Sequence, residues 1–263
     1  RERERAMASA VPEEGQRQDP EVTKQRLLAH VLGTASAGDA ASVLQAVDHF
    51  CYDGNWMMHV GDVKGELLTA EVQKVVQEGA RDLHLLEIGT FCGYSAVRIA
   101  KELRPGVDKL YTLEVNEDNA AIARQIFAHA GVEDRVVSWL GSLSQRLEDL
   151  QSQEGIQTLD LVFVDHWKDQ YLADFQLLLT SGLLQKGSVV VFDNVLFPGC
   201  PDVLAFVQKH GQGGEGEKEG VEEPVLFEYQ LHHSQLEYSA EREDAVLVVK
   251  LLVDPTSTAV PSK

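Results

Sequence analysis

The sequence predicts an α/β protein in which a mostly parallel β-sheet is covered by helices on both faces. From residue 83 onward, short apolar segments alternate with longer segments of helical period. Continuous apolar strands are typical of a parallel sheet that is buried on both faces, and parallel strands need helix-length connections. The 263 residues and the apolar fraction of 44% are enough for one large domain of this kind or two small ones.

The first part of the chain, residues 1–20, is charged and has few large apolar side chains, which predicts disorder. A helical period begins at Pro20, after which apolar residues recur at three- and four-residue steps. These residues are Val22, Leu27, Leu28, Val31 and Leu32. Two further helices are expected over residues 41–49 and about 64–78.

The alternation that follows predicts the sheet and its covering helices. Strands are expected over residues 83–89, 109–115, 135–140, 159–165, 187–193, 225–231 and 245–252. Helices are expected over residues 95–103, 116–131, 143–151, 171–184 and 201–210. Asn116 is a plausible N-cap and Gly131 a C-terminal stop for one of these helices. We expect one domain over residues 21–253, a mobile Gly/Glu-rich loop over residues 211–223, and an irregular tail over residues 254–263.

The charge balance limits the partners. The chain has 23 Lys and Arg against 42 Asp and Glu, which gives a formal net charge of −19. A protein this acidic is repelled by phosphate backbones, so we expect no nucleic-acid partner.

The cysteines and the apolar runs bear on the compartment. Cys51, Cys92 and Cys200 lie far apart without a CxxC spacing, which indicates a reducing compartment. No apolar run reaches about 18 residues, so no membrane span is expected within these residues. We expect a cytoplasmic monomer, and an upstream anchor stays open because the chain does not begin with Met.

A glycine motif follows the first predicted strand. Gly89 and Gly93 stand in an E-x-G-x-x-x-G pattern, where the backbone can approach a ligand and helix N–H groups lie beyond. Glu114 closes the next strand and could accept hydrogen bonds from a ribose, and Glu87 could face a ligand ammonium. This combination fits S-adenosylmethionine better than a dinucleotide, whose binding motif is G-x-G-x-x-G. The alternative is a tight strand–helix turn with a surface glutamate.

Polar residues also close two later strands. Asp165, Asp193 and Asn194 stand at strand ends, and ligands collect outside the carboxyl ends of the strands in open α/β sheets. Two carboxylates and an amide suit a hard cation such as Mg2+. A single Asp at a strand end is more often a helix cap. Lys168 follows within one turn, and a lysine beside a cation suits a general base, although a solvated helix lysine is the alternative.

Five segments together resemble the catechol O-methyltransferase family. They are GNWMMHVGDVKGELL, LLEIGTFCGYSAVRIA, LDLVFVDHWKDQYL, VFDNVLFPGCPD and HSQLEY, and the resemblance runs from about residue 20 to 252. It implies a Rossmann-like sheet of seven strands with an antiparallel last strand. It also implies Mg2+-dependent transfer of a methyl group from S-adenosylmethionine to one hydroxyl of a catechol, such as a catecholamine or a catechol oestrogen.

The resemblance also implies roles for individual residues. Asp165, Asp193 and Asn194 would hold Mg2+, Lys168 would take the catechol proton, and Glu237 would hold the other hydroxyl. The implied cofactor contacts are Met58, Val60, Glu87, Gly89, Ser95, Glu114, Val115, Ser142, Ser144, Asp165 and His166. The implied substrate contacts are Trp56, Trp167, Lys168, Asn194, Pro198 and Glu237.

Some positions depart from the family pattern. His59 stands where an Asn is common, Phe91 replaces a Tyr, and the segment from Gly141 reads GSLS in place of GASQ. The last change bears on the expected adenine contacts at Leu143 and Ser144. None of these departures removes an implied catalytic group.

Two other functions stay open at this point. A non-catalytic binding or trafficking protein can use the same scaffold, because fold alone does not define function. It would be expected to have lost part of the set formed by Asp165, Lys168, Asp193, Asn194 and Glu237. A nicotinamide-dependent dehydrogenase is a more distant alternative.

Overall fold

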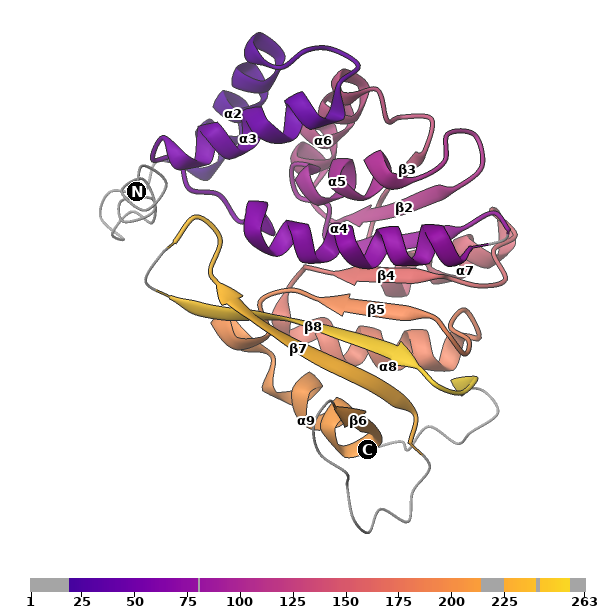
Figure 1. Ribbon diagram of the computed structural model, residues 1–263. Helices are drawn as coiled ribbons and strands as arrows, with labels where there is room; N and C mark the ends of the chain where they lie inside the picture. Colours follow the sequence, from indigo (N-terminus) through magenta and orange to yellow (C-terminus); the bar gives the residue numbers. More distant parts are fainter. Residues whose placement is uncertain (1–18, 80, 214–224, 240–241, 256–263) are drawn as a thin grey trace.

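The protein has a central sheet of eight strands in the order β3-β2-β1-β4-β5-β8-β7-β6 (Figure 1). The computed structural model describes residues 19–79, 81–213, 225–239 and 242–255. The strands are β1 (His84–Ile88), β2 (Lys109–Glu114), β3 (Val136–Leu140), β4 (Leu161–Val164), β5 (Val189–Phe192), β6 (Gly211–Gly213), β7 (Phe227–Gln235) and β8 (Glu243–Leu251).

The pairing confirms a mostly parallel sheet whose last strand is reversed. Strands β1 to β5 pair in parallel, whereas β8 is antiparallel to both of its neighbours, β5 and β7. All seven expected strands form. The expected number of seven is one too low, because β6 adds a short edge strand parallel to β7. Its sequence, Gly-Gln-Gly, carries no apolar alternation that could have indicated a strand.

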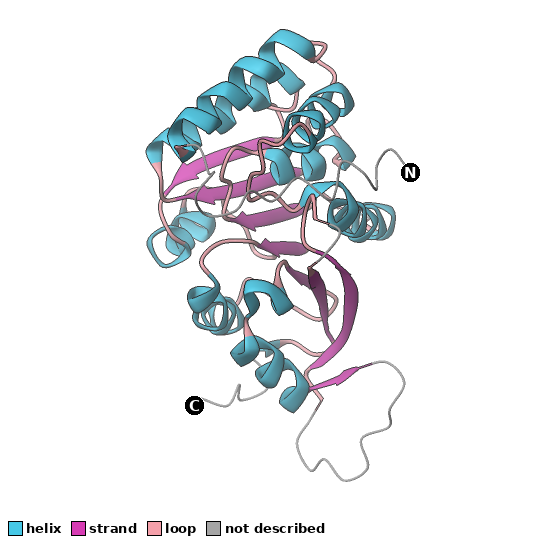
Figure 2. Ribbon diagram, turned by 90° about the vertical axis from the view of Figure 1, so that its left-hand side faces the viewer, coloured by secondary structure: helices cyan, strands magenta, loops and turns pink. Residues whose placement is uncertain are grey.

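Helices cover both faces of the sheet (Figure 2). They are α2 (Pro20–Thr34), α3 (Ala40–Tyr52), α4 (Gly61–Glu78), α5 (Tyr94–Glu102), α6 (Glu117–Ala130), α7 (Leu143–Ser152), α8 (Tyr171–Ser181) and α9 (Pro201–His210). A 3-10 turn (η1, Lys168–Gln170) and a π turn (η2, Val195–Gly199) follow β4 and β5.

Two apolar cores result, one on each face. The core formed with α2 to α6 takes Leu85 and Phe163 from the strands, whereas the core formed with α7 to α9 takes Leu86 and Val164. Alternate residues of each strand therefore point to opposite cores, which explains why the strands read as continuous apolar runs.

Both predicted ends of α6 form as expected, whereas two residues of α2 that were expected to be buried are exposed. The Asn116 side chain accepts a hydrogen bond from Asn119 N at 3.0 Å, and Gly131 ends α6 with a φ of 68°, so both predicted ends of this helix are confirmed. Val22 and Leu32 were expected on the apolar face of α2 but are 53% and 43% exposed. Only a narrow strip around Leu27 reaches the core, because α2 packs on α3 and α6 from outside.

Several expectations fall outside the described residues. Residues 1–18, 214–224 and 256–263 include most of the expected disordered segment, Gly/Glu-rich loop and tail. The domain boundaries therefore stay a prediction. Within the described ranges, no helix combines the length and the apolar character needed to cross a membrane.

Candidate active site

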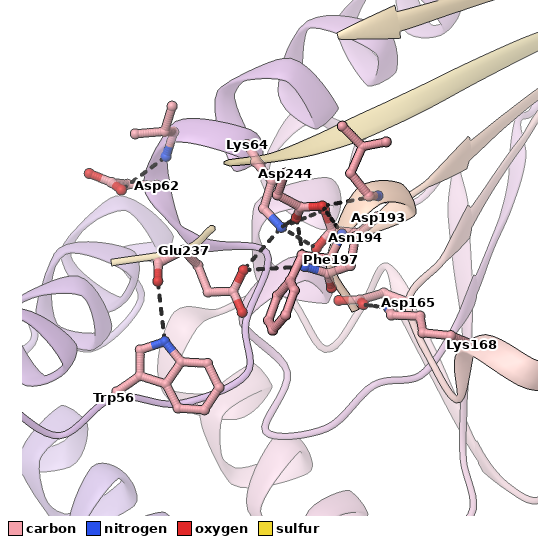
Figure 3. A network of polar contacts seen from close by, with 12 residues as sticks. Trp56, Asp62, Lys64, Asp165, Lys168, Asp193, Asn194, Phe197, Glu237 and Asp244 are labelled. Carbon is pink, nitrogen blue, oxygen red and sulfur yellow. Dashed lines mark hydrogen bonds and ion pairs between the residues drawn. The ribbon is translucent and has the colours of Figure 1, made fainter. Parts of the chain in front are cut away.

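The parallel pairing of β4 and β5 brings the polar strand ends together. Val164 pairs with Phe192, so Asp165 and Asp193 leave the sheet side by side (Figure 3). The Asp193 side chain is fully buried, and that of Asp165 is 16% exposed. Asn194 turns the chain sharply with a φ of 54°, a left-handed conformation that asparagine tolerates. The expected juxtaposition of these three residues therefore occurs.

A buried lysine that the sequence did not predict lies at the centre of this cluster. Lys64, in the first turn of α4, places its Nζ 2.8 Å from Asp193 Oδ1, 3.0 Å from Glu237 Oε2 and 2.8 Å from Asp244 Oδ2. Its side chain has no solvent exposure. The ammonium thus bridges three carboxylates that come from the ends of β5, the β7–β8 connection and β8 (Figure 3).

Asn194 completes this network. Its Nδ2 donates to Asp244 Oδ2 at 2.8 Å and to Glu237 Oε2 at 3.4 Å. Lys64 satisfies hydrogen-bond geometry at Asp193 Oδ2, at 3.0 Å, but not at Oδ1, although Oδ1 is within ion-pair distance. Asp193 Oδ1 therefore keeps lone pairs for a further partner.

The electrostatics of the cluster are uneven. Burial raises the pKa of Asp193 to about 7 against the attraction of Lys64, and burial also raises the pKa of Glu237. Burial alone would raise the pKa of Asp244 as well, but Lys64 and backbone hydrogen bonds hold it below its usual range. For Lys64, the attraction of the three carboxylates outweighs burial and raises the pKa. One ammonium is thus shared among three acids, which leaves the site short of positive charge.

Lys168 lies beside the same acids. It begins η1, and its Nζ is 3.1 Å from Asp165 Oδ1 and hydrogen-bonded to the Tyr171 hydroxyl. The Tyr171 hydroxyl in turn donates to the carbonyl of Asp193 at 3.2 Å. The predicted base is therefore tied to both strand ends that carry the predicted metal ligands.

The glycine loop packs tightly against the β4 end. Gly89 has a φ of 103°, and a Cβ there would lie 2.3 Å from the carbonyl oxygen of Asp165. Any side chain at this position would push the two strand ends apart. The backbone N of Phe91 donates to Glu114 Oε2 at 2.7 Å, and Asn116 N donates to Oε1 at 2.8 Å. Glu114 is thus held between the glycine loop, through Phe91, and the start of α6, through Asn116.

Glu87 has an unusual environment for a carboxylate. It has no solvent exposure, Thr112 donates a hydrogen bond to its Oε2, and burial outweighs the lowering of its pKa by the nearby Ser95 hydroxyl. Its Oε1 has no hydrogen-bond partner among the described residues. Burial raises its pKa to about 7. A buried carboxylate oxygen without a donor is costly, and a cationic ligand group would satisfy it.

The remaining expected cofactor contacts are spread along the same edge. Met58 and Val115 are 62% and 60% exposed, whereas Val60 is buried at the start of α4. Ser142 and Ser144 begin α7, with their hydroxyl oxygens 3.1 Å apart. Exposed apolar residues at an otherwise polar edge are available to a ligand.

His166 and three implied substrate contacts, Trp56, Trp167 and Pro198, differ in exposure and in their contacts. The His166 ring stacks on Tyr171, and its Nε2 lies 2.9 Å from Asp174 Oδ2, so His166 is oriented toward α8. Trp167 is 74% exposed, and Pro198, which follows a cis peptide bond, is also exposed. Trp56 is half-buried and donates from Nε1 to the carbonyl of Glu237 at 3.2 Å.

His59, the departure from the family pattern, lies inside the protein. Its ring is close to the rings of Phe91 and Tyr94, with centroids 5.5 and 5.3 Å away. Burial lowers the pKa of His59 to about 4. A neutral imidazole therefore stands where the family resemblance implies an amide.

Sequence reasoning missed Lys64 and Asp244. Lys64 carried a usable signal, because it stands four and eight residues before Leu68 and Val72 on the buried face of α4. A lysine on an apolar face needs a charged partner. Asp244 carried no such signal, since it looks like the polar residue before a strand.

The donor set is compatible with a cation. The described part of the chain contains no group of three or more His, Cys, Asp or Glu side chains arranged for a metal ion. The predicted set is different, with two carboxylates and one amide. Oxygen donors of this kind suit Mg2+, and Asp193 Oδ1 retains lone pairs for it.

The architecture and the polar groups at the strand ends define an open α/β protein with its ligand site outside the carboxyl edge. The sequence model of the O-methyltransferase family matches residues 34–208. Catechol O-methyltransferase of Mus musculus is 45% identical over 70% of this chain and 68% of its own length, and catechol O-methyltransferase B of Danio rerio is 48% identical over 70% and 67%. The chain belongs to the O-methyltransferase family.

A solved structure supports the fold independently. An O-methyltransferase from Streptomyces achromogenes, in complex with SAM, covers 92% of this chain and 99% of its own with a TM-score of 0.60. Its sequence identity is 23%, so the similarity concerns the fold alone.

Proposed function

We propose that this protein is a Mg2+-dependent catechol O-methyltransferase that uses S-adenosylmethionine. One observation carries the proposal: Asp165, Asp193, Asn194, Lys168 and Glu237 surround one region of the carboxyl edge, next to the glycine loop. The identity to proteins named catechol O-methyltransferase supports the choice of substrate.

The acids of the glycine loop support the cofactor. Glu87 offers a buried carboxylate oxygen that lacks a donor, which suits the ammonium of S-adenosylmethionine. Glu114 has one backbone donor on each oxygen, so each oxygen retains a lone pair for a ribose hydroxyl. The exposed side chains of Met58 and Val115 would cover apolar parts of the cofactor.

Asp165, Asp193 and Asn194 would hold the cation. When bound, Mg2+ would supply a Lewis acid for the catechol oxygens, and S-adenosylmethionine would supply the methyl group.

The residues of this chain then orient the catechol and remove its proton. Lys168 Nζ would accept the proton of the reacting hydroxyl, and Asp165, 3.1 Å away, holds the lysine in place. Glu237 would accept a hydrogen bond from the other hydroxyl, and Trp56, Trp167 and Pro198 would confine the ring. A phenolate attacking a sulfonium loses charge as it reacts, so orientation of the two reactants should carry much of the catalysis.

The complete set of polar groups favours an enzyme over a non-catalytic scaffold protein. Each of the five groups is present, and all five belong to one contiguous network of polar contacts with Lys64 and Tyr171. The E-x-G-x-x-x-G pattern disfavours a nicotinamide cofactor.

The test is a turnover assay with labelled S-adenosylmethionine against a catechol panel, with and without Mg2+. Matched monophenols serve as controls, because they cannot bind through two oxygens. We expect methylation of catechols only, dependent on Mg2+. Asp193→Ala should abolish turnover but retain cofactor binding, measured by calorimetry, because a small hard-cation site loses charge and geometry together. Turnover of Asp193→Ala at the unmodified rate, or none by the unmodified protein, would contradict the proposal.

A further inference from the structure

Asp48 is a half-buried acid outside the cluster at the strand ends, yet it connects the two halves of the site. It lies on α3, and its Oδ1 accepts hydrogen bonds from the Tyr94 hydroxyl at 2.8 Å and the Tyr238 hydroxyl at 3.0 Å. Tyr94 begins α5 directly after the glycine loop, and Tyr238 follows Glu237. One carboxylate oxygen thus joins a helix of the cofactor half to a loop of the substrate half.

The direction of these hydrogen bonds is determined by Arg98. Its Nη2 donates to the Tyr94 hydroxyl at 2.9 Å, so the single proton of that hydroxyl is directed to Asp48. Arg98 is itself held by Glu66 at 2.9 Å and Thr69 at 3.1 Å. Asp48 is therefore anchored to a rigid, charged chain of hydrogen bonds on α4 and α5.

Tyr238 needs such an anchor. Its φ is 53°, a left-handed conformation that is unfavourable for an aromatic residue. Its side chain is buried, and its ring meets Tyr52 edge-to-face with centroids 5.1 Å apart. The fixed side chain holds the backbone in this conformation together with the turn hydrogen bond from Ser239 N to the Leu236 carbonyl, at 3.0 Å, and the next residue toward the N-terminus is Glu237.

The position of Glu237 leaves little tolerance. A Cβ on Gly61 would lie 2.8 Å from Glu237 Cβ, so the start of α4 packs directly against this residue. Its carboxylate is 3.0 Å from Lys64 Nζ, and its carbonyl accepts from Trp56. A small rotation of the backbone at Tyr238 would therefore move the carboxylate relative to Lys64 and Asn194.

We propose that Asp48 is a positioning residue that acts through Tyr238 to hold Glu237 in place for the second hydroxyl of the catechol. The inference rests on the proposed function for its kinetic consequence. Asp48 touches none of the groups assigned to the reaction, and it acts as an acceptor for a tyrosine rather than as an acid or base.

Two variants of similar size separate an acceptor from a merely structural residue. Asp48→Leu removes the acceptor, whereas Asp48→Asn keeps an oxygen that can accept from both hydroxyls. Tyr238→Phe removes the donor on the other side. Tyr111→Phe is the matched control, because its hydroxyl also bonds a carboxylate, that of Glu154 at 3.3 Å, but on β2 facing the other core.

We expect Asp48→Leu and Tyr238→Phe each to raise the KM for the catechol about tenfold, the equivalent of one hydrogen bond to a charged group. The dissociation constant of the cofactor should change less than about twofold, because ground-state binding of the catechol alone is affected. The double variant should be no worse than the poorer single variant, since both changes remove the same interaction. Tyr111→Phe should behave like the unmodified protein, and Asp48→Asn should lose much less than Asp48→Leu, because it keeps an acceptor without the charge.

An increase in the cofactor dissociation constant of Asp48→Leu as large as the increase in its KM for the catechol would overturn the inference. Additive increases in the KM of the double variant would also overturn it. If the unmodified protein methylates no catechol, the proposed function fails, and the KM measurements then cannot test the role of Asp48. A crystal structure of Asp48→Leu then decides, because the inference requires the Glu237 carboxylate to leave its position 3.0 Å from Lys64. An unchanged position would reject it.

Discussion

Two groups of buried acids lie along the carboxyl edge of the sheet, and the protein compensates their charge in different ways. Glu87 and Glu114, in the glycine-loop half, accept hydrogen bonds from hydroxyls and backbone N–H groups. Asp193, Glu237 and Asp244, in the other half, share the ammonium of Lys64. Neutral donors leave the first half without a cation of its own, which suits a cationic cofactor. The second half is partly neutralised from within.

This difference has a consequence for stability. Loss of one neutral donor leaves a single acceptor unsatisfied, at a cost of about 1–3 kcal/mol, whereas loss of the only cation leaves several buried carboxylates uncompensated and costs more. The Lys64 half should therefore depend on one side chain, whereas the glycine-loop half should tolerate loss of a single donor. Four changes test the comparison.

Lys64→Met should have the largest effect. It leaves three carboxylates without their cation, and breaking such a buried pair costs about 3–5 kcal/mol in the free energy of unfolding. Lys74→Met is the control on the same helix, since the Lys74 side chain is 62% exposed and its single ion pair, with the part-buried Glu71, should contribute only about 1 kcal/mol. Urea unfolding of both variants measures the difference. Equal, small losses would show that the Lys64 cluster contributes no special stability.

Glu87→Gln should stabilise the protein, in contrast to Lys64→Met. Because the pKa of Glu87 is about 7 in the folded protein and about 4.5 when unfolded, the folded state keeps a proton that the unfolded state loses. The free energy of unfolding then falls as pH rises from about 4.5 to 7, by up to about 3 kcal/mol. The Glu87→Gln substitution removes this pH-dependent loss in the free energy of unfolding, but it weakens cofactor binding. Asp48 and Asp193 titrate in the same pH range, with pKa values of about 6 and 7. The quantity to measure is therefore the difference in the free energy of unfolding between the unmodified protein and Glu87→Gln at each pH. Parallel curves for the two proteins would contradict the assignment.

Lys168→Arg tests the base rather than the charge. Arginine keeps the positive charge beside Asp165 but does not lose its proton. Single-turnover methylation should slow at least about a hundredfold, the lower end of what positioned proton transfer contributes. A nitrocatechol, which is more acidic, should recover part of the loss. Near-normal rates on an ordinary catechol would reduce Lys168 to an electrostatic neighbour of the site.

Glu114→Ala should have the smallest effect of the four. It removes a charged acceptor for the ribose and should weaken cofactor binding by about 2 kcal/mol, as measured by calorimetry. Turnover at saturating cofactor should fall much less. Glu117→Ala, an exposed acid at the start of α6, is the control and should leave the dissociation constant unchanged. If both variants bind equally well, Glu114 has no role at the ribose.

The sequence was informative where a feature is local. Helix and strand periods predicted each large element, and Asn116 and Gly131 predicted the ends of α6, because capping depends on neighbouring residues. The strand ends at Asp165 and Asp193 were also predictable, since parallel strands present their carboxyl ends at one edge. By contrast, the exposure of Val22 and the short strand β6 depend on what packs alongside them.

The succession of strands and helices along the chain and the polar strand ends were therefore determined by the sequence alone, because period and chain direction are written in consecutive residues. The partners of the buried charges were decided by the tertiary structure. Lys64 meets Asp193 and Asp244 across 129 and 180 residues, and Asp48 meets Tyr238 across 190. No local pattern encodes such contacts, since they depend on how α3 and α4 cross the sheet and on the turn that carries Glu237. A buried charge selects its partner only after the core around it has formed, because desolvation makes the pairing necessary.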